Sequence, residues 1–231
     1  MKNKRLILSL LLILCCTASI LFVNFKIATS TFSFQKENKL ILIDPGHGGI
    51  DGGAVSKRGT VEKDLNLQIS KKVKTALTNL GYQVIMTRED DSGLYENNGT
   101  IRNKKIQDLN NRIKMINSSG ANVFISIHMN MFPESKYYGA QVWYSDKYES
   151  KVLAHMIQVG LKTDINNVNK RDEKAANNSY KILRESEIVS VLVECGFLTN
   201  YNEEQQLLNE EYQNKIAISI AASVDKFYKV N

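Results

Sequence analysis

The chain has 231 residues, enough for one globular domain with a short appendage, and its 43% hydrophobic and 23% charged residues exclude a disordered chain as the default. The net charge of +6 is concentrated at one end, because the first thirty residues contain four basic residues and no acidic one. The rest of the chain has 26 basic and 24 acidic residues, a balance that gives no reason to expect nucleic acid as a partner.

The N-terminus has the pattern of an export signal. A basic start, Lys2 to Arg5, precedes an uncharged apolar stretch from Leu6 to Phe25. A stretch of this length spans about 30 Å as a helix, close to the thickness of the hydrocarbon core, and positive charges before it keep that end in the cytoplasm. Small residues suitable for cleavage follow at Ala28-Thr29-Ser30. We therefore expect residues 1–30 to be a signal peptide or an N-terminal membrane anchor, and the rest of the protein to be exported.

From Asn38 onward, predicted strands alternate with predicted helices. The strands are short apolar runs at Leu40–Ile43, Tyr82–Met86, Val123–Ile127, Ala140–Tyr144 and Val189–Val193. The helices have apolar residues at helical spacing and cover about Glu62–Leu80, the segment around Ile106–Ile116, Lys151–Leu161 and a tail from Glu203 to Tyr228. Gly81 and Gly120 are placed to end the first two helices, and the polar region Asp164–Asn178 is predicted to be a surface loop.

This alternation predicts an α/β fold. We expect three layers, with a mostly parallel, twisted sheet of about six strands and helices on both of its faces. A single domain would cover residues 38–229, because the chain shows no internal repeat and no low-complexity linker in this range.

Ionisable residues follow three of the predicted strands. His47 lies just after the first strand, His128 ends the run Ile125-Ser126-Ile127-His128, and Glu194 follows the last strand. Functional groups in parallel α/β sheets gather at the carboxyl ends of the strands. Glu62 opens the first helix, which in a right-handed strand–helix unit starts near the same edge. Two imidazoles, a carboxylate and an open position make the ligand set of a hydrolytic zinc site, and a further carboxylate is what proton transfer there requires.

Each of these residues also has an ordinary structural explanation. A lone histidine after a strand is more often a packing or capping residue, and Glu62 in a first helical turn suits the helix dipole. A carboxylate next to a core strand, as at Glu194, is costly unless it is paired or bound to a metal. The zinc interpretation explains all four positions together and is preferred for that reason.

The remaining histidine and the cysteines are expected to have no role in the chemistry. His155 lies within a predicted helix, away from the strand ends. Cys15 and Cys16 fall in the apolar N-terminal stretch, so Cys195 is alone in the exported part and cannot form a disulfide within it. No strand-end histidine is left to serve Cys195 as a base, which favours a small buried residue over a nucleophile.

Six sequence motifs resemble those of the zinc-dependent N-acetylmuramoyl-L-alanine amidases. The resemblance runs from about Leu40 to Tyr228 and is carried by IDPGHGG at 43–49, EKDLNL at 62–67, TREDD at 87–91, SIHMN at 126–130, GAQVWY at 139–144 and LVECGFLTN at 192–200. It implies that His47, Glu62 and His128 hold zinc and that Glu194 is catalytic. It also implies peptidoglycan as the substrate, cut between N-acetylmuramic acid and L-alanine. Substrate orientation is expected from the loops around the crevice, with Asn130, Arg112 and Arg171 as candidate contacts, although an arginine on such a fold is more often a solvated or paired surface residue.

In length and layout the chain is similar to the sporulation branch of this family, whose members remove stem peptides on the way to the muramic-δ-lactam of the spore cortex. This similarity implies a location between the mother-cell and forespore membranes. Two departures from the family pattern affect the expected shape of the groove: Met131 stands where a small residue is usual, and Ile188-Val189-Ser190 where a proline is frequent.

Three alternatives differ in class from a self-sufficient amidase. One alternative is an amidase that a protein partner switches on. The sequence shows no expected wall-binding repeats, so affinity for the wall would have to come from the groove, the N-terminal segment or a partner. A non-catalytic peptidoglycan-binding protein is expected to lack one of the four site residues, and this chain has all of them. A cytosolic zinc peptidase is opposed by the export signal.

Overall fold

The computed structural model describes residues 14–22 and 39–230, which fall in two units of the chain, Met1–Asn38 and Lys39–Asn231. In the first unit, residues 14–22 form a helix with exposed side chains. Most of the predicted export signal, residues 1–30, lies outside the described residues. Among the helices that are described, none is both long and apolar enough to cross a membrane.

The second unit is built on one six-stranded sheet with the order β2-β1-β3-β6-β4-β5. Four adjacent strands are parallel: β2 (Gln83–Met86), β1 (Leu40–Pro45), β3 (Val123–Asn130) and β6 (Val189–Phe197). The last two strands, β4 (Gln141–Tyr144) and β5 (Lys174–Ala175), run in the opposite direction. The mostly parallel sheet is confirmed, and it places the carboxyl ends of β1, β3 and β6 next to one another.

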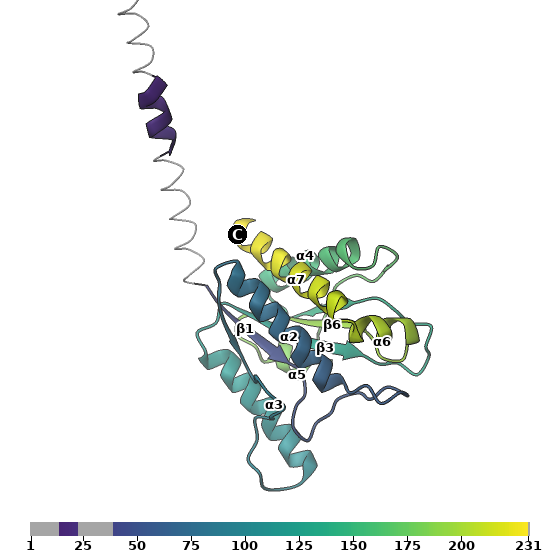
Figure 1. Cartoon of the computed structure of the whole chain (residues 1–231). Coiled ribbons are helices and arrows are strands. Elements are labelled where there is room, and N and C mark those ends of the chain that lie inside the picture. The colour runs from purple at the N-terminus through teal and green to yellow at the C-terminus, as the bar shows by residue number, and fades with distance from the viewer. Residues whose placement is uncertain (1–13, 23–38, 231) are drawn as a thin grey trace, which may run out of the picture. The chain divides into compact units, whose positions relative to one another are not determined.

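Helices cover both faces of this sheet (Figure 1). One face packs against α2 (Glu62–Asn79), α4 (Tyr148–Asp164) and α7 (Glu210–Val230), and the other against α3 (Ile101–Ser118) and α5 (Lys181–Arg184). A short helix, α6 (Tyr201–Leu208), follows β6 and precedes α7. The predicted three-layer arrangement is therefore also confirmed.

Strand alternation decides which face receives the polar residues. Successive side chains of a strand point to opposite faces. In β3, Phe124 enters the core beneath α3 and α5, whereas Ile125 enters the core beneath α2, α4 and α7. In β6, Leu192 lies on the α3 and α5 side. By the same alternation, His128 and Glu194 point toward the side of α3 and α5.

Two strands are longer than their apolar runs. β3 continues from Ile127 to Asn130, and β6 continues from Val193 to Phe197, so His128 and Glu194 lie inside strands and not after them. The two strands pair with each other through this region, and the ladder needs only backbone groups, which polar residues supply equally well.

The structure also divides or extends other predicted segments. The helical tail is broken at Asn209, whose backbone is extended and whose side chain accepts a hydrogen bond from the Tyr212 amide, so that one helix ends and another begins. The predicted loop Asp164–Asn178 contains the two-residue strand β5. The four-residue helix α5 was not predicted, because four residues are too few to show a helical period.

Candidate functional site

The loop after β1 holds His47 in a backbone conformation that is unusual for histidine. The φ angle of His47 is 62°, and Gly48 and Gly49 that follow also have positive φ. This left-handed region costs a residue with a Cβ roughly 1–2 kcal/mol, so it persists only where the surroundings enforce it. The sequence Gly46-His47-Gly48-Gly49 places flexible residues on either side of the strained one.

Two buried arginines supply that enforcement. Nε of Arg88 donates to the carbonyl oxygen of His47 at 2.8 Å, and Nη2 of Arg112 donates to the same oxygen at 2.6 Å. Arg112 is fixed in turn by ion pairs with Asp44 and Asp108. The sequence predicts a substrate contact for Arg112. In the structure its guanidinium is buried among protein acceptors and holds the carbonyl oxygen of His47.

Side chains from three elements meet in one cluster. Nε2 of His47, from the loop, lies 3.3 Å from Oε1 of Glu62, the first residue of α2. Nδ1 of His128, from β3, lies 3.0 Å from the same oxygen. One ligand atom from each of the three residues lies within 4.8 Å of the others, so the group could hold a metal ion. The structure thus brings together the three residues for which the sequence predicts metal binding.

Further hydrogen bonds orient the cluster. Nδ1 of His47 bonds to Oδ2 of Asp51 at 2.9 Å, which leaves Nε2 to face Glu62. Asp51 is held by Lys105 at 2.7 Å. Oε1 of Glu62 accepts the backbone amide of Met129 at 3.1 Å, and its Oε2 accepts the amide of Ala54 at 2.8 Å. Partners of this kind fix the ring and carboxylate orientations that a metal requires.

The charges in the cluster are strongly coupled. Burial alone would lower the pKa of His47, but its hydrogen bonds to Asp51 and Glu62 raise that pKa to about 9. Burial would raise the pKa of Glu62, yet the two histidines bonded to it hold it well below its usual range. A divalent metal would compete with the proton for these same nitrogen and oxygen atoms.

The donor set and its spacing fit zinc. Ligand atoms around a tetrahedral zinc lie roughly 3.3 Å apart at its usual bond lengths, close to the separations between Glu62 and the two histidines. Glycines also leave the room that the cluster needs. A Cβ added at Gly46 would lie 2.2 Å from Nε2 of His128, and one at Gly53 would lie 2.6 Å from Oε2 of Glu62. The residues present therefore fit the metal that the sequence predicts.

Glu194 lies beside this cluster. It is the register partner of His128 across the β3–β6 pair, and it is buried. Its Oε1 accepts a hydrogen bond from the hydroxyl of Tyr180 at 3.0 Å, whereas Oε2 has no partner among the described residues. Burial raises the pKa of Glu194, and the charge of Glu62 adds to the rise against the opposing effect of His128. A carboxyl group with a raised pKa and one free oxygen is suited to accepting and releasing a proton.

A cavity of about 400 Å³ adjoins the cluster. Its lining includes His47 and His128, together with Lys105 of α3 and Tyr180 and Ile182 at α5. The cavity thus lies on the α3 and α5 side of the sheet, where strand alternation also directs Glu194. A substrate in this cavity would be in contact with the cluster.

Asn130 and Arg171, for which the sequence also predicts substrate contacts, lie outside the metal cluster. Asn130 ends β3, two residues after His128. Arg171 lies over the ring of Phe197, 4.6 Å from its centroid, and bonds to the carbonyl of Tyr138 and to Gln141. A direct substrate contact stays a prediction for Asn130, for Arg171 and for Arg112, which lines the cavity.

His155 and Cys195, which the sequence predicts to have no role in the chemistry, lie in different surroundings. The side chain of His155 is exposed on α4 and bonds to Glu173. Cys195 is buried in the core, and burial raises the pKa of its thiol.

Three residues near the site are not singled out by sequence reasoning. Arg88 falls in the motif TREDD, but its contact with the His47 carbonyl is visible only in three dimensions. Asp51 lies four residues after His47, a spacing that offers a weak local signal for an orienting carboxylate. Tyr180 lies in the region between two predicted elements, where no pattern marks it.

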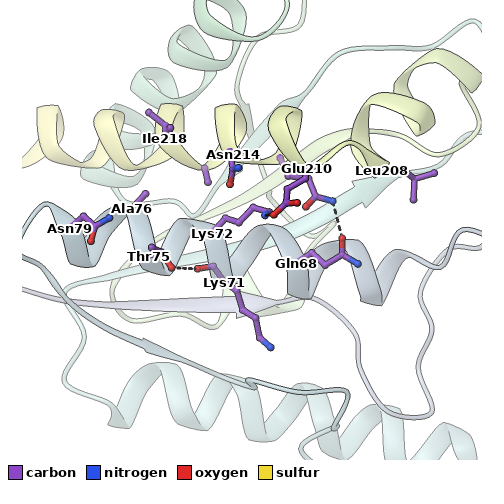
Figure 2. Close-up of a pocket in the computed structure, with 12 residues that line it drawn as sticks. Gln68, Lys71, Lys72, Thr75, Ala76, Asn79, Leu208, Glu210, Asn214 and Ile218 are labelled. Atoms are coloured by element: carbon purple, nitrogen blue, oxygen red, sulfur yellow. Dashed lines mark hydrogen bonds and ion pairs between the residues drawn. The ribbon is translucent and has the colours of Figure 1, made fainter.

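A larger hollow lies elsewhere. About 910 Å³ in volume, it runs between α2 and α7, and Figure 2 shows side chains of both helices along it. Lys72 and Glu210 lie across the hollow from each other (Figure 2) and form an ion pair. Gln68 accepts a hydrogen bond from Gln213 of α7. No residue of the metal cluster lines this hollow.

Comparisons with known proteins agree with this geometry. The family model for N-acetylmuramoyl-L-alanine amidase matches residues 41–226. The germination-specific N-acetylmuramoyl-L-alanine amidase of Bacillus subtilis is 38% identical over 199 residues, which cover 85% of this chain and 83% of that protein. Among solved structures, the CwlD amidase of Clostridioides difficile in complex with the GerS lipoprotein is 46% identical, with a TM-score of 0.81 over 84% of this chain and 100% of that one. An N-acetylmuramoyl-L-alanine amidase from Clostridium difficile 630 is 37% identical, with a TM-score of 0.72 over 83% and 97%.

Proposed function

The chain belongs to the family of N-acetylmuramoyl-L-alanine amidases, and from this premise we propose that it cuts the muramoyl–alanine amide bond of peptidoglycan with the help of a zinc ion held by His47, Glu62 and His128. The observation that carries the proposal is the convergence of these three ligands next to the buried Glu194. Each of the four residues has the chemistry that such a site needs, which disfavours a non-catalytic binding protein on the same scaffold.

Zinc at this cluster would supply a Lewis acid that polarises the amide carbonyl. It would also lower the pKa of a water molecule, which then gives up a proton more readily and attacks the carbonyl carbon. The protein supplies the proton transfer. Glu194 accepts the proton of the attacking water and then delivers it to the alanine nitrogen as the carbon–nitrogen bond breaks. Its raised pKa and its Oε2 atom, which has no hydrogen-bond partner in the described part of the chain, support both halves of this role.

The protein also holds the metal ligands still during the reaction. Asp51 orients His47, while Arg88 and Arg112 restrain the strained loop that carries it. A site held in place before the substrate arrives does not need to reorganise when charge develops on the carbonyl oxygen.

We propose further that the substrate is spore peptidoglycan, processed on the way to cortex muramic-δ-lactam. The similarity to a relative named as germination-specific and to a CwlD amidase supports this choice. The basic and apolar N-terminal residues 2–25 support export, and a cortex enzyme would then act between the mother-cell and forespore membranes.

Activation by a protein partner is a second proposal, supported by the CwlD amidase structure, which is a complex with a lipoprotein. A partner attached to the membrane surface would bring the enzyme to its insoluble substrate. It would also stabilise whichever conformation it binds.

The test is digestion of purified peptidoglycan, followed by mass spectrometry of the muropeptides. Zinc-loaded protein is expected to release intact stem peptides with a free L-alanine amino group, chelator-treated protein to release none, and added zinc to restore release. Cleavage at another bond would contradict the assigned reaction, and full activity after metal removal would contradict the role of zinc.

Two further arms separate the finer proposals. Comparison of cortex with vegetative wall tests the substrate: equal rates on both would contradict a cortex preference. Adding an extract of sporulating cells tests the partner. Release of stem peptides only with extract is expected if a partner is required, and equal release without extract would exclude that requirement.

A further inference from the structure

The carboxylate of Glu194 is held by one side chain. The Tyr180 hydroxyl donates to Oε1 at 3.0 Å, and Oε2 has no hydrogen-bond partner among the described residues. The terminal torsion of a glutamate side chain is broad, so a carboxylate without a fixed neighbour can rotate and exchange its two oxygens. The hydrogen bond from Tyr180 therefore decides which oxygen is occupied and which is left for chemistry.

Tyr180 is itself fixed firmly. It caps the beginning of α5, where its carbonyl accepts the backbone amides of Leu183 and Arg184. Its ring lies 5.2 Å from that of Trp143 on β4, centroid to centroid. The ring also packs against the smaller core beneath α3 and α5. Because the ring and backbone of Tyr180 are packed in this way, its hydroxyl has a defined position, which the hydroxyl of a flexible surface side chain would not have.

The same residue faces the substrate side of the site. Tyr180 lines the 400 Å³ cavity together with His47 and His128. Burial, followed by the neighbouring Glu194, raises the pKa of the Tyr180 hydroxyl, so the hydroxyl keeps its proton and acts as a donor to the carboxylate.

We propose that Tyr180 is the positioning residue of the proton-transfer step: its hydroxyl holds Oε1 of Glu194 and so leaves Oε2 as the oxygen that exchanges protons with water and the leaving nitrogen. This inference rests on the proposed role of Glu194. It adds a residue that lies outside the six amidase motifs and that acts through Glu194 without touching the reacting atoms.

The variant Tyr180→Phe removes the hydroxyl and keeps the ring against Trp143. We expect kcat on muropeptide substrate to fall about tenfold, the size expected for one lost hydrogen bond to a charged group. KM and zinc content should stay within about twofold of the parent, because in the proposed role the hydroxyl acts on Glu194 and not on substrate or metal. A rise in KM with unchanged kcat would overturn the proposal.

A second background tests whether Tyr180 acts through Glu194. In Glu194→Asp the carboxylate is one methylene group shorter and withdraws from the hydroxyl, so adding Tyr180→Phe should change kcat by less than about twofold. An equal tenfold fall in both backgrounds would mean that Tyr180 acts independently of Glu194 and would overturn the proposal.

The matched control is Tyr82→Phe. Tyr82 also donates a buried hydroxyl hydrogen bond to a carboxylate, Oδ1 of Asp225 at 3.0 Å, but it lies at the start of β2, away from the carboxyl ends of the strands. We expect this variant to lower the midpoint of thermal unfolding and to leave kcat unchanged. A tenfold loss of kcat in Tyr82→Phe as well would assign the Tyr180 effect to general destabilisation.

The proposed roles of Glu194 and Tyr180 can be disproved separately. If Glu194→Gln turned over substrate normally, the proposed function of Glu194 would fail, and the role of Tyr180 with it. If Glu194→Gln were inactive while Tyr180→Phe kept full kcat, only the inference about Tyr180 would fail.

Discussion

Two hollows of the second unit differ in what their walls contain. The groove between α2 and α7 has a volume of about 910 Å³, and its polar groups pair with one another near the surface, as Lys72 does with Glu210. The cavity at the ends of β1 and β3 has less than half that volume, about 400 Å³. Yet it adjoins two histidines that share the buried Glu62, with the buried Glu194 beside them, and the pKa values of both carboxyl groups are shifted.

The difference shows that convergence of buried polar groups, and not volume, marks the chemical site. An ion pair at a surface gains little, because water and salt screen it. A buried carboxylate such as Glu194 is costly unless something near it uses its charge or its proton. Changes at the small cavity should therefore have large effects, and changes at the groove should have small ones.

The largest effect is expected from His128→Ala. This change removes a metal ligand, so zinc content and amidase turnover should disappear together, with a loss in rate above about 10⁴-fold. Zinc is measured by elemental analysis of the purified protein, and turnover by muropeptide release. The control is His155→Ala, on the exposed side of α4, which should keep both. Retention of stoichiometric zinc by the His128 variant would place the metal elsewhere.

Glu194→Gln should separate zinc binding from turnover. Its side chain is nearly the same size but cannot accept the proton of water, so we expect turnover to fall by about 10²–10⁴-fold with zinc content unchanged. Loss of zinc from this variant would instead make Glu194 a ligand. The same two assays, on the same preparations, decide between these outcomes.

Arg112→Ala tests the support behind the cluster. Removing one partner of a buried ion pair leaves Asp44 uncompensated and should lower the free energy of unfolding by about 3–5 kcal/mol. It also frees the carbonyl of His47, so zinc affinity should fall in the variant molecules that remain folded. Urea unfolding measures the first quantity. A change below about 1 kcal/mol would show that the ion pair with Asp44 contributes little to stability, and an unchanged zinc affinity would show that Arg112 does not restrain the loop.

Asp51→Asn should have a moderate effect. The amide keeps the size of the side chain but weakens its hydrogen bond to His47, and partners of this kind alter metal affinity by about 10–100-fold. Competition with a zinc chelator measures the change. Asp172→Asn is the matched control, because it neutralises an exposed carboxylate that pairs with Lys162 far from the metal ligands in the sequence. Equal zinc affinities in the two variants would remove Asp51 from the site.

The smallest effect is expected in the groove. Lys72→Ala breaks the ion pair with the exposed Glu210, and the free energy of unfolding should change by less than about 0.5 kcal/mol, with turnover unaffected. A clear loss of turnover would mean that the groove takes part in the reaction. The contrast between the two hollows would then no longer hold.

Much of the fold could be predicted because it depends on local patterns. Apolar runs such as Leu40–Ile43 indicate buried strands, and apolar residues at helical spacing indicate α2 through Leu65, Ile69 and Val73. Elements with weak or absent patterns were missed or misjudged. The two residues of β5 are placed by pairing with β4, and the break in the C-terminal helical region depends on one asparagine cap.

The candidate metal ligands could be predicted because parallel strands end at one edge of a sheet, whatever their order in the chain. The sequence by itself therefore determined the α/β class and the grouping of His47, Glu62 and His128. Only the tertiary structure decided what restrains them. The contacts of Arg88 and Arg112 with His47, and of Tyr180 with Glu194, join residues 14 to 65 positions apart in the chain. No periodicity or spacing encodes such contacts, because they depend on which side chains the folded backbone brings within hydrogen-bonding distance.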